Sequence, residues 1–504
     1  MPGRSGSRAK GLVPLALVAL LATACPSNDV EPQPRPSAGS PTEEPRAAGE
    51  VVVAYPHEPA TLDPFAPAGQ APATRDLTRL LMPALYRLGP GGARERWLLA
   101  EDPVVSEQPR FTVSVRLRED AVWSDGTPIT MDDLQVTWRH VMNRDAASRL
   151  GYDRIRRIVA DAPKAGRIEF RARYDDWRDL FGAGLGVLPA HILEEDPDAF
   201  ARAWPVSGGP FVLQRWRRGL DITFAPTPRA WGGDAPRLER LRVAFAPDTI
   251  GALELFRRGD ADVLGPYHAP DWRRRVSEVP GVTISAETGA ASAVLLFDTE
   301  AAPFDRPGVR RALAYAIDRA RLVRGLIQAE GEELNGIDAS DTSFARYTED
   351  LARARGQLTN GLNLEATIAL GGDDLSAVLL RAIQFQAQRV GFDLQAVSLD
   401  SEQLWSEWLD GPDMTLAIVI LREPNLLALL PEGARRGADA ASVGRTVPFL
   451  PLYRVSVGLA ASARVSGVCA SASPDGPLWN AHAWQVAGSG TRVEGAACPS
   501  LVAA

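Results

Sequence analysis

The feature that most constrains the fold is an alternation of strand and helix patterns in the second half of the chain. The apolar run "LRVAFAP" leads into a helical pattern that begins near Asp248 or Thr249 and ends at Gly259, after which "ADVLGPY" returns as a strand pattern. A second unit joins "SAVLLFD" to a helix over 307–319. A third joins "LEATIAL" to a long helix that ends at Gly391 before "FDLQAVSL". Repeated strand–helix–strand units predict an α/β fold, here in two lobes.

A different pattern occupies the first half of the chain. After the buried strand pattern "VVVAY" at Val51, the segments "RFTVSVRL" and "RIEFRARY" alternate apolar and polar residues, which is typical of half-buried antiparallel strands. This change of pattern predicts a more antiparallel insertion between about Pro67 and Trp204.

A tight turn joined to a capped helix lies inside this insertion, in "VWSDGTPITMDDLQVTWRHVM". The run Ser124-Asp125-Gly126 combines two side chains that bond their own backbone with a residue free to take a positive φ. Thr130 and Asp133 have the spacing of a capping box. The predicted helix has one apolar face, formed by Leu134, Trp138, Val141 and Met142.

Composition restricts the class of protein. A chain of 504 residues is long enough for two or three domains, and 45% hydrophobic with 23% charged residues is typical of a soluble globular protein. The net charge is -8, from 55 basic and 63 acidic residues. Because nucleic-acid binding needs clustered positive charge, this balance disfavours a nucleic-acid partner.

The N-terminus has the pattern of an export signal. Basic residues precede an apolar run from Leu12 to Ala22, which is too short for a permanent membrane span. "LATAC" then places small residues before Cys25, resembling a bacterial lipobox in which this cysteine is lipidated; an ordinary secretory signal is the alternative. We therefore predict a signal peptide over 1–24, then a lipid-anchored, disordered tether over 25–50 that is rich in Pro, Ser and Glu.

Motifs of catalysis and metal binding are absent from the sequence. It contains no P-loop, G-x-S-x-G, H-E-x-x-H or calcium-loop spacing, and its five histidines have no neighbours at metal-ligand spacing. The pair Asp132 and Asp133 is explained by a helix start. We therefore expect no enzyme activity, no cofactor and no metal. In an exported protein, Cys469 and Cys498 favour a disulfide over two free thiols.

The turn–helix segment resembles the signature of the family 5 extracellular solute-binding proteins, the peptide and nickel receptors of ABC importers. Other segments agree with this family in the same order along the chain, from about Val51 to about Trp484: "TLDPFAP", "SGGPFVLQRW", "RAWGGDAPRLERLRVAF", "APFDRPGVRRALAYAIDRARLV", "AIQFQAQRVGFDLQAV" and "VPFLPLYRV". The resemblance implies a type II periplasmic-binding-protein fold, with two lobes joined by a hinge and an extra subdomain inserted in the first lobe.

The resemblance also implies how the chain is divided. Lobe I would cover 51–290, including the insertion of about 67–204. A trimmed lobe II would cover 291–445, and 446–504 would return to lobe I. The two crossings between the lobes would lie near Gly289 to Ala293 and near Gly444 to Pro448.

Residues near the ligand cleft can be carried over from the family one by one. The loop from Ser207 to Pro210 is one of these positions, although its glycines could simply shape a turn. Each of the other positions could likewise have a purely structural role instead of contacting the ligand. The expected ligand-binding residues are Tyr55, Gly208, Gly209, Trp231, Asp298, Arg422 and Tyr453.

The departures from the family concern lobe II. Peptide-binding members hold the peptide's amino group with an Asp, and alignment on Pro424 places Ile420 at that position. If Arg422 faces the cleft, its guanidinium suits a carboxylate or phosphate; the alternative is a solvent-facing loop residue.

Two classes of function remain open at this stage. The first is a monomeric, lipid-anchored receptor on the outer face of the cell membrane that delivers a small polar solute, such as an oligopeptide, to the permease subunits of an ABC importer. The second is a diverged lipoprotein of the same fold that acts in sensing or envelope assembly without transport.

Overall fold

The computed structural model describes most of the chain after residue 46. The described residues are 47–66, 69, 71–143, 151–182, 185–267, 272–326, 331–337, 341–359, 362–371, 374–399, 404, 414–421, 426–430 and 439–487.

One large sheet passes through two hydrophobic cores. We call the first core the cluster that includes Val51, Trp97 and Phe181, and the second core the cluster that includes Leu295 and Tyr453; they define lobe I and lobe II. The described strands of the sheet follow the order β15 (Asp393–Leu399), β14 (Glu365–Gly371), β16 (Leu416–Leu421), β12 (Thr283–Phe297), β17 (Phe449–Ala461), β11 (Val263–Tyr267), β1 (Glu50–Pro56), β10 (Arg240–Ala246), β9 (Asp221–Pro226) and β8 (Phe211–Arg217), with β13 (Gly331–Glu333) paired to β17.

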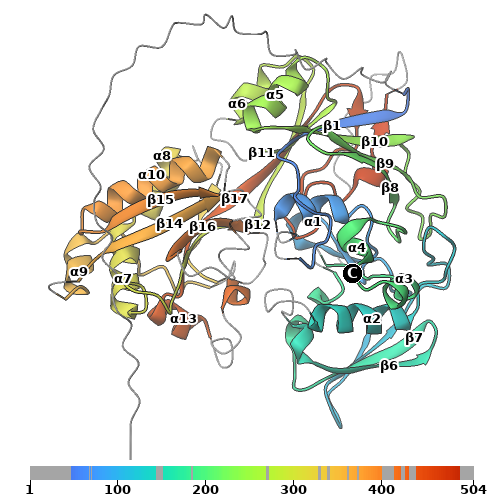
Figure 1. The fold of residues 1–504 in the computed structure, drawn as a ribbon, viewed down its shortest axis with the longest axis horizontal. Coiled ribbons are helices and arrows are strands. Elements are labelled where there is room, and N and C mark those ends of the chain that lie inside the picture. The colour runs from blue at the N-terminus through green and yellow to red at the C-terminus, as the bar shows by residue number, and fades with distance from the viewer. Residues whose placement is uncertain are drawn as a thin grey trace, which may run out of the picture. The chain divides into compact units, whose positions relative to one another are not determined.

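Lobe I is built on the buried strand β1. This strand pairs in parallel with β10 along its length and with β11 on its other edge. Its side chains alternate between the first core, through Val51 and Val53, and a separate cluster on the opposite face, through Val52 and Ala54. Helices cover that opposite face, as Figure 1 shows: α5 (Thr249–Arg257) and α6 (Trp272–Ser277).

The first predicted strand–helix–strand unit is confirmed in lobe I. Helix α5 connects β10 to β11, and β1 lies between these two parallel strands. The helix starts where the sequence predicts it, because the Asp248 side chain accepts a hydrogen bond from the Gly251 N–H at 2.7 Å. Gly259 follows the helix with a φ of 79°, which favours glycine.

Lobe II contains the third predicted unit but not the second. β14 and β15 are parallel and are connected by α10 (Asp374–Gln388), as expected. The strand "SAVLLFD" is the end of β12, which is antiparallel to both β16 and β17. Strand direction depends on these distant partners, so the local pattern could not reveal it.

The predicted helix over 307–319 is two helices, α7 (Pro307–Ala316) and α8 (Arg319–Leu326). Ile317 between them is extended, with φ -93° and ψ 115°. The break turns Arg319 into the second core, where it is 1% exposed. Its guanidinium donates to the carbonyl oxygens of Leu334, Phe344, Tyr347 and Pro451. A charged group can be buried here because these acceptors replace water.

β12 and β17 connect the two lobes (Figure 1). They pair antiparallel from Thr283↔Ala461 to Leu296↔Phe449. The register shifts between Thr288 and Ser292, where residues 289–291 of β12 stand opposite the single residue Val455. On one side of this bulge Ala461 belongs to the first core, and on the other side Ala293 belongs to the second. The bulge therefore lies at the boundary of the lobes.

The second crossing lies later than the sequence predicted. Gly444 lies in α13 (Ala440–Thr446), and Val447, Phe449 and Leu450 belong to the second core. β17 reaches the boundary of the lobes only at about 454–458. The run "VPFLPLYRVSVGLAA" is one continuous strand pattern, so nothing local marks where it leaves lobe II.

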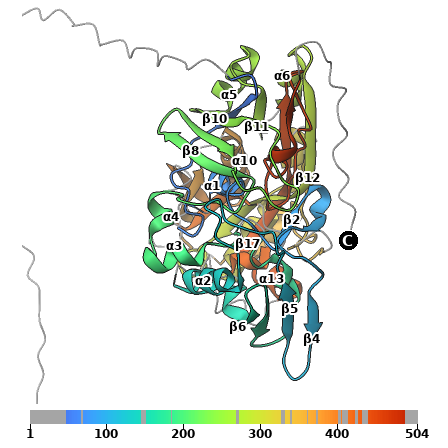
Figure 2. The same cartoon turned by 90° about the vertical axis from the view of Figure 1, so that its right-hand side faces the viewer.

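The inserted subdomain is an antiparallel sheet with helix α2 (Met131–Met142) against β6. Its strands follow the order β4 (Val104–Ser106), β5 (Thr112–Arg116), β7 (Ala165–Phe170) and β6 (Ile155–Ala162), and Figure 2 shows the hairpin of β4 and β5. The strand pattern "RIEFRARY" ends at Phe170, so its second half is not strand. The remaining elements named below are α1 (Pro72–Thr78), α3 (Ala190–Glu195), α4 (Ala199–Arg202), β2 (Tyr86–Leu88), β3 (Arg94–Arg96), β18 (Val465–Ser466) and β19 (Gln485–Val486).

The predicted turn and capping box are confirmed. Gly126 has a φ of 97°, and the Thr130 side chain and the Asp133 side chain each accept a backbone N–H at the start of α2. Asp133 does more than cap, because it also accepts the N–H of Ala190 in α3 at 2.7 Å. Burial raises the pKa of this carboxyl to about 6. The turn and helix are therefore scaffold of the inserted subdomain.

Each described helix is too short or too polar to cross a lipid bilayer. The signal peptide and tether predicted for 1–50 lie almost wholly outside the described residues, which begin at Ala47.

Candidate ligand site and its buried supports

Tyr55 lies at the carboxyl end of β1 and is 2% exposed. Its hydroxyl donates to Asp76 Oδ2 of α1 at 2.5 Å. This bond ties the end of the central strand to the helix beside it. Tyr55 is therefore a buried structural residue that holds α1 against the end of β1.

The loop from Ser207 to Pro210 is held against the chain that follows α1. The N–H groups of Gly208 and Gly209 and the Ser207 hydroxyl all donate to the carbonyl oxygen of Leu81, at 3.0, 2.9 and 2.8 Å. A Cβ on Gly208 would lie 2.6 Å from Pro83 Cγ, and one on Gly209 only 2.4 Å from the carbonyl oxygen of Leu80. Gly209 is required for the close approach of two backbones, and Gly208 for the close approach of its backbone to the Pro83 ring.

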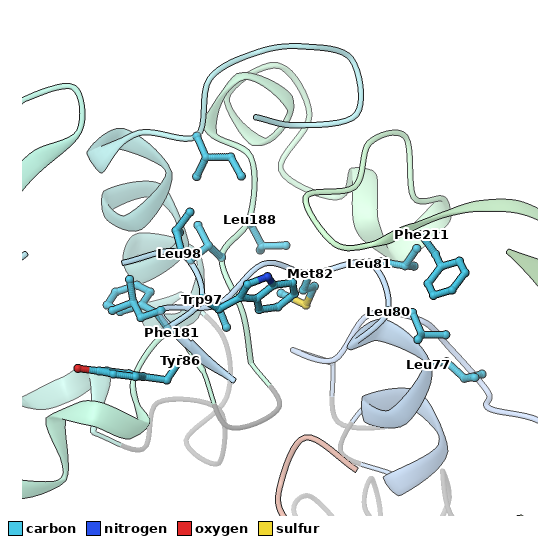
Figure 3. Packing of buried hydrophobic residues seen from close by; sticks show 14 of the residues in the cluster. Leu77, Leu80, Leu81, Met82, Tyr86, Trp97, Leu98, Phe181, Leu188 and Phe211 are labelled. Carbon is cyan, nitrogen blue, oxygen red and sulfur yellow. The ribbon is translucent and has the colours of Figure 1, made fainter. Parts of the chain in front are cut away.

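Trp231 is 7% exposed and belongs to a buried stack. Its ring lies 5.7 Å from that of Trp97 at an interplanar angle of 24°. The guanidinium carbon of Arg87 lies 4.5 Å from the Trp97 ring centroid, and that of Arg79 lies 5.0 Å from it. Figure 3 shows Trp97 among the leucine, methionine and phenylalanine side chains of the first core.

The two arginines of this stack join distant segments of lobe I. Arg79 pairs with Asp475 at 2.9 Å, and both side chains are at least 96% buried. Arg87 pairs with Asp234 at 2.5 Å. Burial lowers the pKa of Arg79 and raises that of Asp475, while their mutual attraction opposes both shifts. Sequence reasoning missed this network, because its partners are up to 396 residues apart.

Asp298, one of the expected ligand-binding residues, lies on the lobe II side of the crossing, past the end of β12. It follows Phe297, the last residue of β12, at the end of the lobe II strand. Its Oδ1 accepts the N–H groups of Glu300 and Ala301 at 2.9 and 3.3 Å. The carboxylate therefore caps a turn, a role that Asp fills as well as Asn.

Tyr453 and Ile420 flank the same residue of β12 at the boundary of the lobes. Ala293 pairs with Tyr453 of β17 on one side and with Ile420 of β16 on the other. Tyr453 is fully buried, and Ile420 is partly buried against the second core. The position aligned with the family's amine-binding Asp is therefore an apolar one in this chain.

Arg454, which follows Tyr453 in β17, was not predicted from the sequence as a site residue. Arg454 stands opposite Ser292 on β12 and opposite Glu332 on β13, directly beside the bulge. Arg454 is partly buried, and its side chain makes no hydrogen bond or ion pair with another described residue. The sequence does contain one signal for this residue, because Arg454 is the only charged residue in the run "PLYRVSV".

The remaining predicted residues lie at or beyond the limits of the described chain. Arg422, Cys25 and Cys498 lie outside the described residues. Cys469 is fully buried and disulfide-bonded, and no described residue is its partner. Pairing with Cys498 stays a prediction. Among the residues that the structure describes, no group of three or more His, Cys, Asp and Glu side chains could hold a metal ion.

The chain has two cores, and β12 and β17 pass from one to the other side by side, with a bulge where they cross. This arrangement defines a two-lobed α/β binding protein of the type II periplasmic-binding-protein fold. Residues 96–419, well over half of the chain, match the model of the bacterial extracellular solute-binding proteins, family 5 Middle, and the chain belongs to this family.

The chain is similar to the probable monoacyl phosphatidylinositol tetramannoside-binding protein LpqW of Mycobacterium tuberculosis, with 28% identity over 287 residues, 53% of this chain and 44% of LpqW. It is 31% identical over 327 residues to protein XP55 of Streptomyces lividans, covering 61% of this chain and 56% of XP55. The chain thus spans about half the length of these relatives. The oligopeptide-binding protein AppA of Bacillus subtilis, solved with a nonapeptide, superposes with a TM-score of 0.74 at 16% identity, over 88% of this chain and 100% of AppA.

Proposed function

We propose that this protein is a monomeric receptor on the outer face of the cell membrane, anchored by a lipid on Cys25. It binds a small polar solute, such as an oligopeptide, between its lobes and delivers it to the permease of an ABC importer. The observation that carries this proposal is the bulge at residues 289–291, because a crossing with locally interrupted pairing is where two rigid lobes can rotate. A ligand that contacts both lobes would then stabilise the closed form.

The residues beside the crossing restrict the ligand. A buried ammonium needs a nearby carboxylate, and Ile420 takes the position where the family has one. Arg454 supplies a guanidinium without a side-chain partner among the described residues, one register row away, although Glu332 stands opposite it. We therefore infer that the ligand is anionic or neutral, and that it is not held by an amino group.

Native mass spectrometry of the mature protein, purified without added ligand, tests the receptor proposal. We expect a co-purifying solute below about 1 kDa that is anionic or neutral and that dissociates on mild activation. The variant Arg454→Met should carry less of this solute, while Arg116→Met, an exposed arginine of the inserted subdomain, should carry the same amount. Absence of any solute, together with no change in small-angle scattering on adding peptides, would count against a solute receptor.

Calorimetry separates this ligand class from ordinary peptide capture. Trialanine and N-acetyl-trialanine should bind equally or not at all. A receptor that holds the amine with a carboxylate should instead lose several kcal/mol on acetylation. Strong binding that acetylation abolishes would show that another acid holds the amine, and would overturn the inference from Ile420.

The second candidate is a lipoprotein of the same fold that acts in sensing or envelope assembly. The apolar Ile420 position favours it, and the similar protein LpqW is named for a glycolipid ligand. Uptake of the identified solute by cells with and without the gene separates the two. Unchanged uptake combined with an altered envelope would favour the second candidate.

A further inference from the structure

Lobe II carries a group of arginines where three helices meet. Helix α7 packs against α13 and against α9 (Leu351–Gly356), and Figure 1 shows the three helices in the same part of lobe II. These helices and the turn before α9 supply what we call the arginine patch: Arg311, Arg346, Arg353, Arg355 and Arg445. Four of these side chains are exposed, and the one from α7 is partly buried.

Arg311 of α7 connects the ends of the other two helices. Its guanidinium donates to Gln357 Oε1, directly after α9, at 2.9 Å. It also donates to the carbonyl oxygen of Arg445, in the last turn of α13, at 3.1 Å. The C-terminal ends of α9 and α13 therefore lie close together beside α7.

Two buried tyrosines bring further arginines onto the same surface. The Tyr315 and Tyr347 rings lie 4.8 Å apart. The guanidinium carbon of Arg353 lies 4.9 Å from the Tyr315 ring centroid, and that of Arg346 lies 5.9 Å from the Tyr347 ring centroid. Burial raises the pKa of the Tyr347 hydroxyl, and the charges of Arg346, Arg311 and Arg353 oppose this shift. Three guanidiniums therefore act on one group and belong to one surface.

The patch has little negative charge to balance it. None of its five arginines makes an ion pair with a carboxylate in the part of the chain that the structure describes. Of the two acids before α9, Asp350 caps the helix by accepting the Arg353 N–H at 2.9 Å, and Glu349 pairs with Arg389. Arg353 lies in the first turn of α9, where the helix dipole disfavours a cation. On a chain of net charge -8, the patch is a local excess of positive charge.

The surface around the patch is charged and not apolar. The exposed large apolar side chains of the described chain all lie outside α7, α9, α13 and the turn before α9: Val104, Val105, Ile250, Phe385 and Val397. Protein–protein interfaces usually have a core of aromatic and apolar side chains, which this surface lacks. Guanidinium groups without carboxylate partners suit phosphates, and their spread over three helices suits a surface of phosphates more than one small ligand.

We propose that the arginine patch is a docking surface for anionic phospholipid, by which lobe II lies against the membrane. The proposal depends on the proposed location beside a membrane and not on solute binding. The predicted tether from Cys25 to Ala47 keeps the lobes within about 25 to 70 Å of the bilayer, from a flexible to an extended chain. The attraction falls off within a Debye length, so the contact forms only when the patch reaches the headgroups.

Co-sedimentation with lipid vesicles tests this surface without any change in the patch. The test uses the mature protein with Cys25→Ser, which carries no lipid. At low ionic strength we expect binding to vesicles that contain phosphatidylglycerol, and no binding to vesicles of phosphatidylcholine alone. Binding should be lost at about 1 M salt, where the Debye length is about 3 Å. Cell fractionation at the same high salt therefore keeps the test of the lipid anchor separate from this contact.

A double variant locates the binding on the patch. Arg346→Gln combined with Arg353→Gln should weaken binding to the anionic vesicles about thirtyfold, about fivefold for each arginine. The matched control combines Arg116→Gln with Arg173→Gln, two exposed arginines of the inserted subdomain, and changes the net charge equally. It should bind like the parent protein.

Three outcomes would overturn the proposal. They are no binding to the anionic vesicles, equal binding to both kinds of vesicle, and an equal effect of the two double variants. Absence of binding would leave an acidic partner protein as the occupant of the patch. Native mass spectrometry of the Arg346→Gln, Arg353→Gln protein should show the same co-purifying solute as the parent, so failure of this proposal and failure of the receptor proposal can be told apart.

Discussion

Some charged side chains of lobe I are buried and have no contact with bulk water. The pair of Arg79 and Asp475 joins the chain after α1 to the C-terminal segment, and Asp475 also accepts the N–H of Leu88 at 2.6 Å. Because neither side chain is hydrated, each depends on the other for its charge. The pair is therefore a strong constraint on where the C-terminal segment lies.

Removing one partner of this pair should be costly. We expect Arg79→Met to lower the free energy of unfolding by about 3–5 kcal/mol, because it leaves the Asp475 carboxylate buried and unpaired. The control is Arg116→Met, which breaks an exposed ion pair with Glu101 and should change stability by less than about 1 kcal/mol. Urea unfolding of both variants measures the difference. Equal effects of the two substitutions would contradict the role assigned to Arg79.

His482 should make stability depend on pH. Burial, reinforced by the nearby Arg87, lowers its pKa from about 6.5 to about 4, while Asp234 opposes the shift and Arg237 adds to it. Below pH 6.5 the unfolded chain binds a proton that the folded protein does not bind until about pH 4. The free energy of unfolding should therefore fall as the pH falls through this window, by about 3 kcal/mol from this group, and level off below it.

The variant His482→Gln isolates this contribution from the carboxyl groups that titrate in the same window. Its free energy of unfolding should fall less steeply than that of the wild type between pH 6.5 and pH 4. Parallel pH profiles for the two proteins would show that His482 does not titrate as its burial implies.

At the scale of elements, a few single residues decide where whole segments lie, either by permitting close contact or by burying a charged side chain. The loop before β8 touches the chain after α1 through Gly208 and Gly209, and α8 starts where Arg319 enters the second core. Both features place whole elements, yet each depends on one residue type at one position.

Gly209 provides the test at this scale. In Gly209→Ala the new Cβ would lie 2.4 Å from the Leu80 carbonyl oxygen, so one backbone must move. We expect a loss of about 1–3 kcal/mol in the free energy of unfolding. Gly325→Ala is the matched control, because Gly325 lies in α8 with no atom within 4 Å of the added Cβ. That substitution should be neutral or stabilise by up to about 1 kcal/mol. A stable Gly209→Ala protein would show that the loop is not tightly held.

At the scale of the whole molecule, the proposed receptor needs an anchor that is independent of the folded lobes. If Cys25 is lipidated, Cys25→Ser should move the protein from the membrane fraction to the medium. Its thermal unfolding should stay the same, since the predicted tether adds nothing to either core. Fractionation followed by immunoblotting measures this, with Cys469→Ser as a control that should alter stability. Retention of Cys25→Ser in the membrane would contradict the predicted lipobox.

The sequence determined the features that depend on neighbouring residues. Helix starts at Asp248 and Thr130, the turn at Gly126 and the strands around β1 and β14 follow from capping, backbone freedom and hydrophobic period, all of which act over a few residues. The segments that resemble the family 5 proteins also predicted the two-lobed fold, because their order along the chain specifies the same arrangement.

Only the tertiary structure decided what depends on residues far apart in the chain. The antiparallel direction of β12 and the late crossing of β17 each require a partner strand that the local pattern does not contain. The buried pairs of Arg79 and Arg87 likewise join segments separated by more than a hundred residues. Such contacts form only when the chain has collapsed, since burial gives them their energy and no local spacing encodes them.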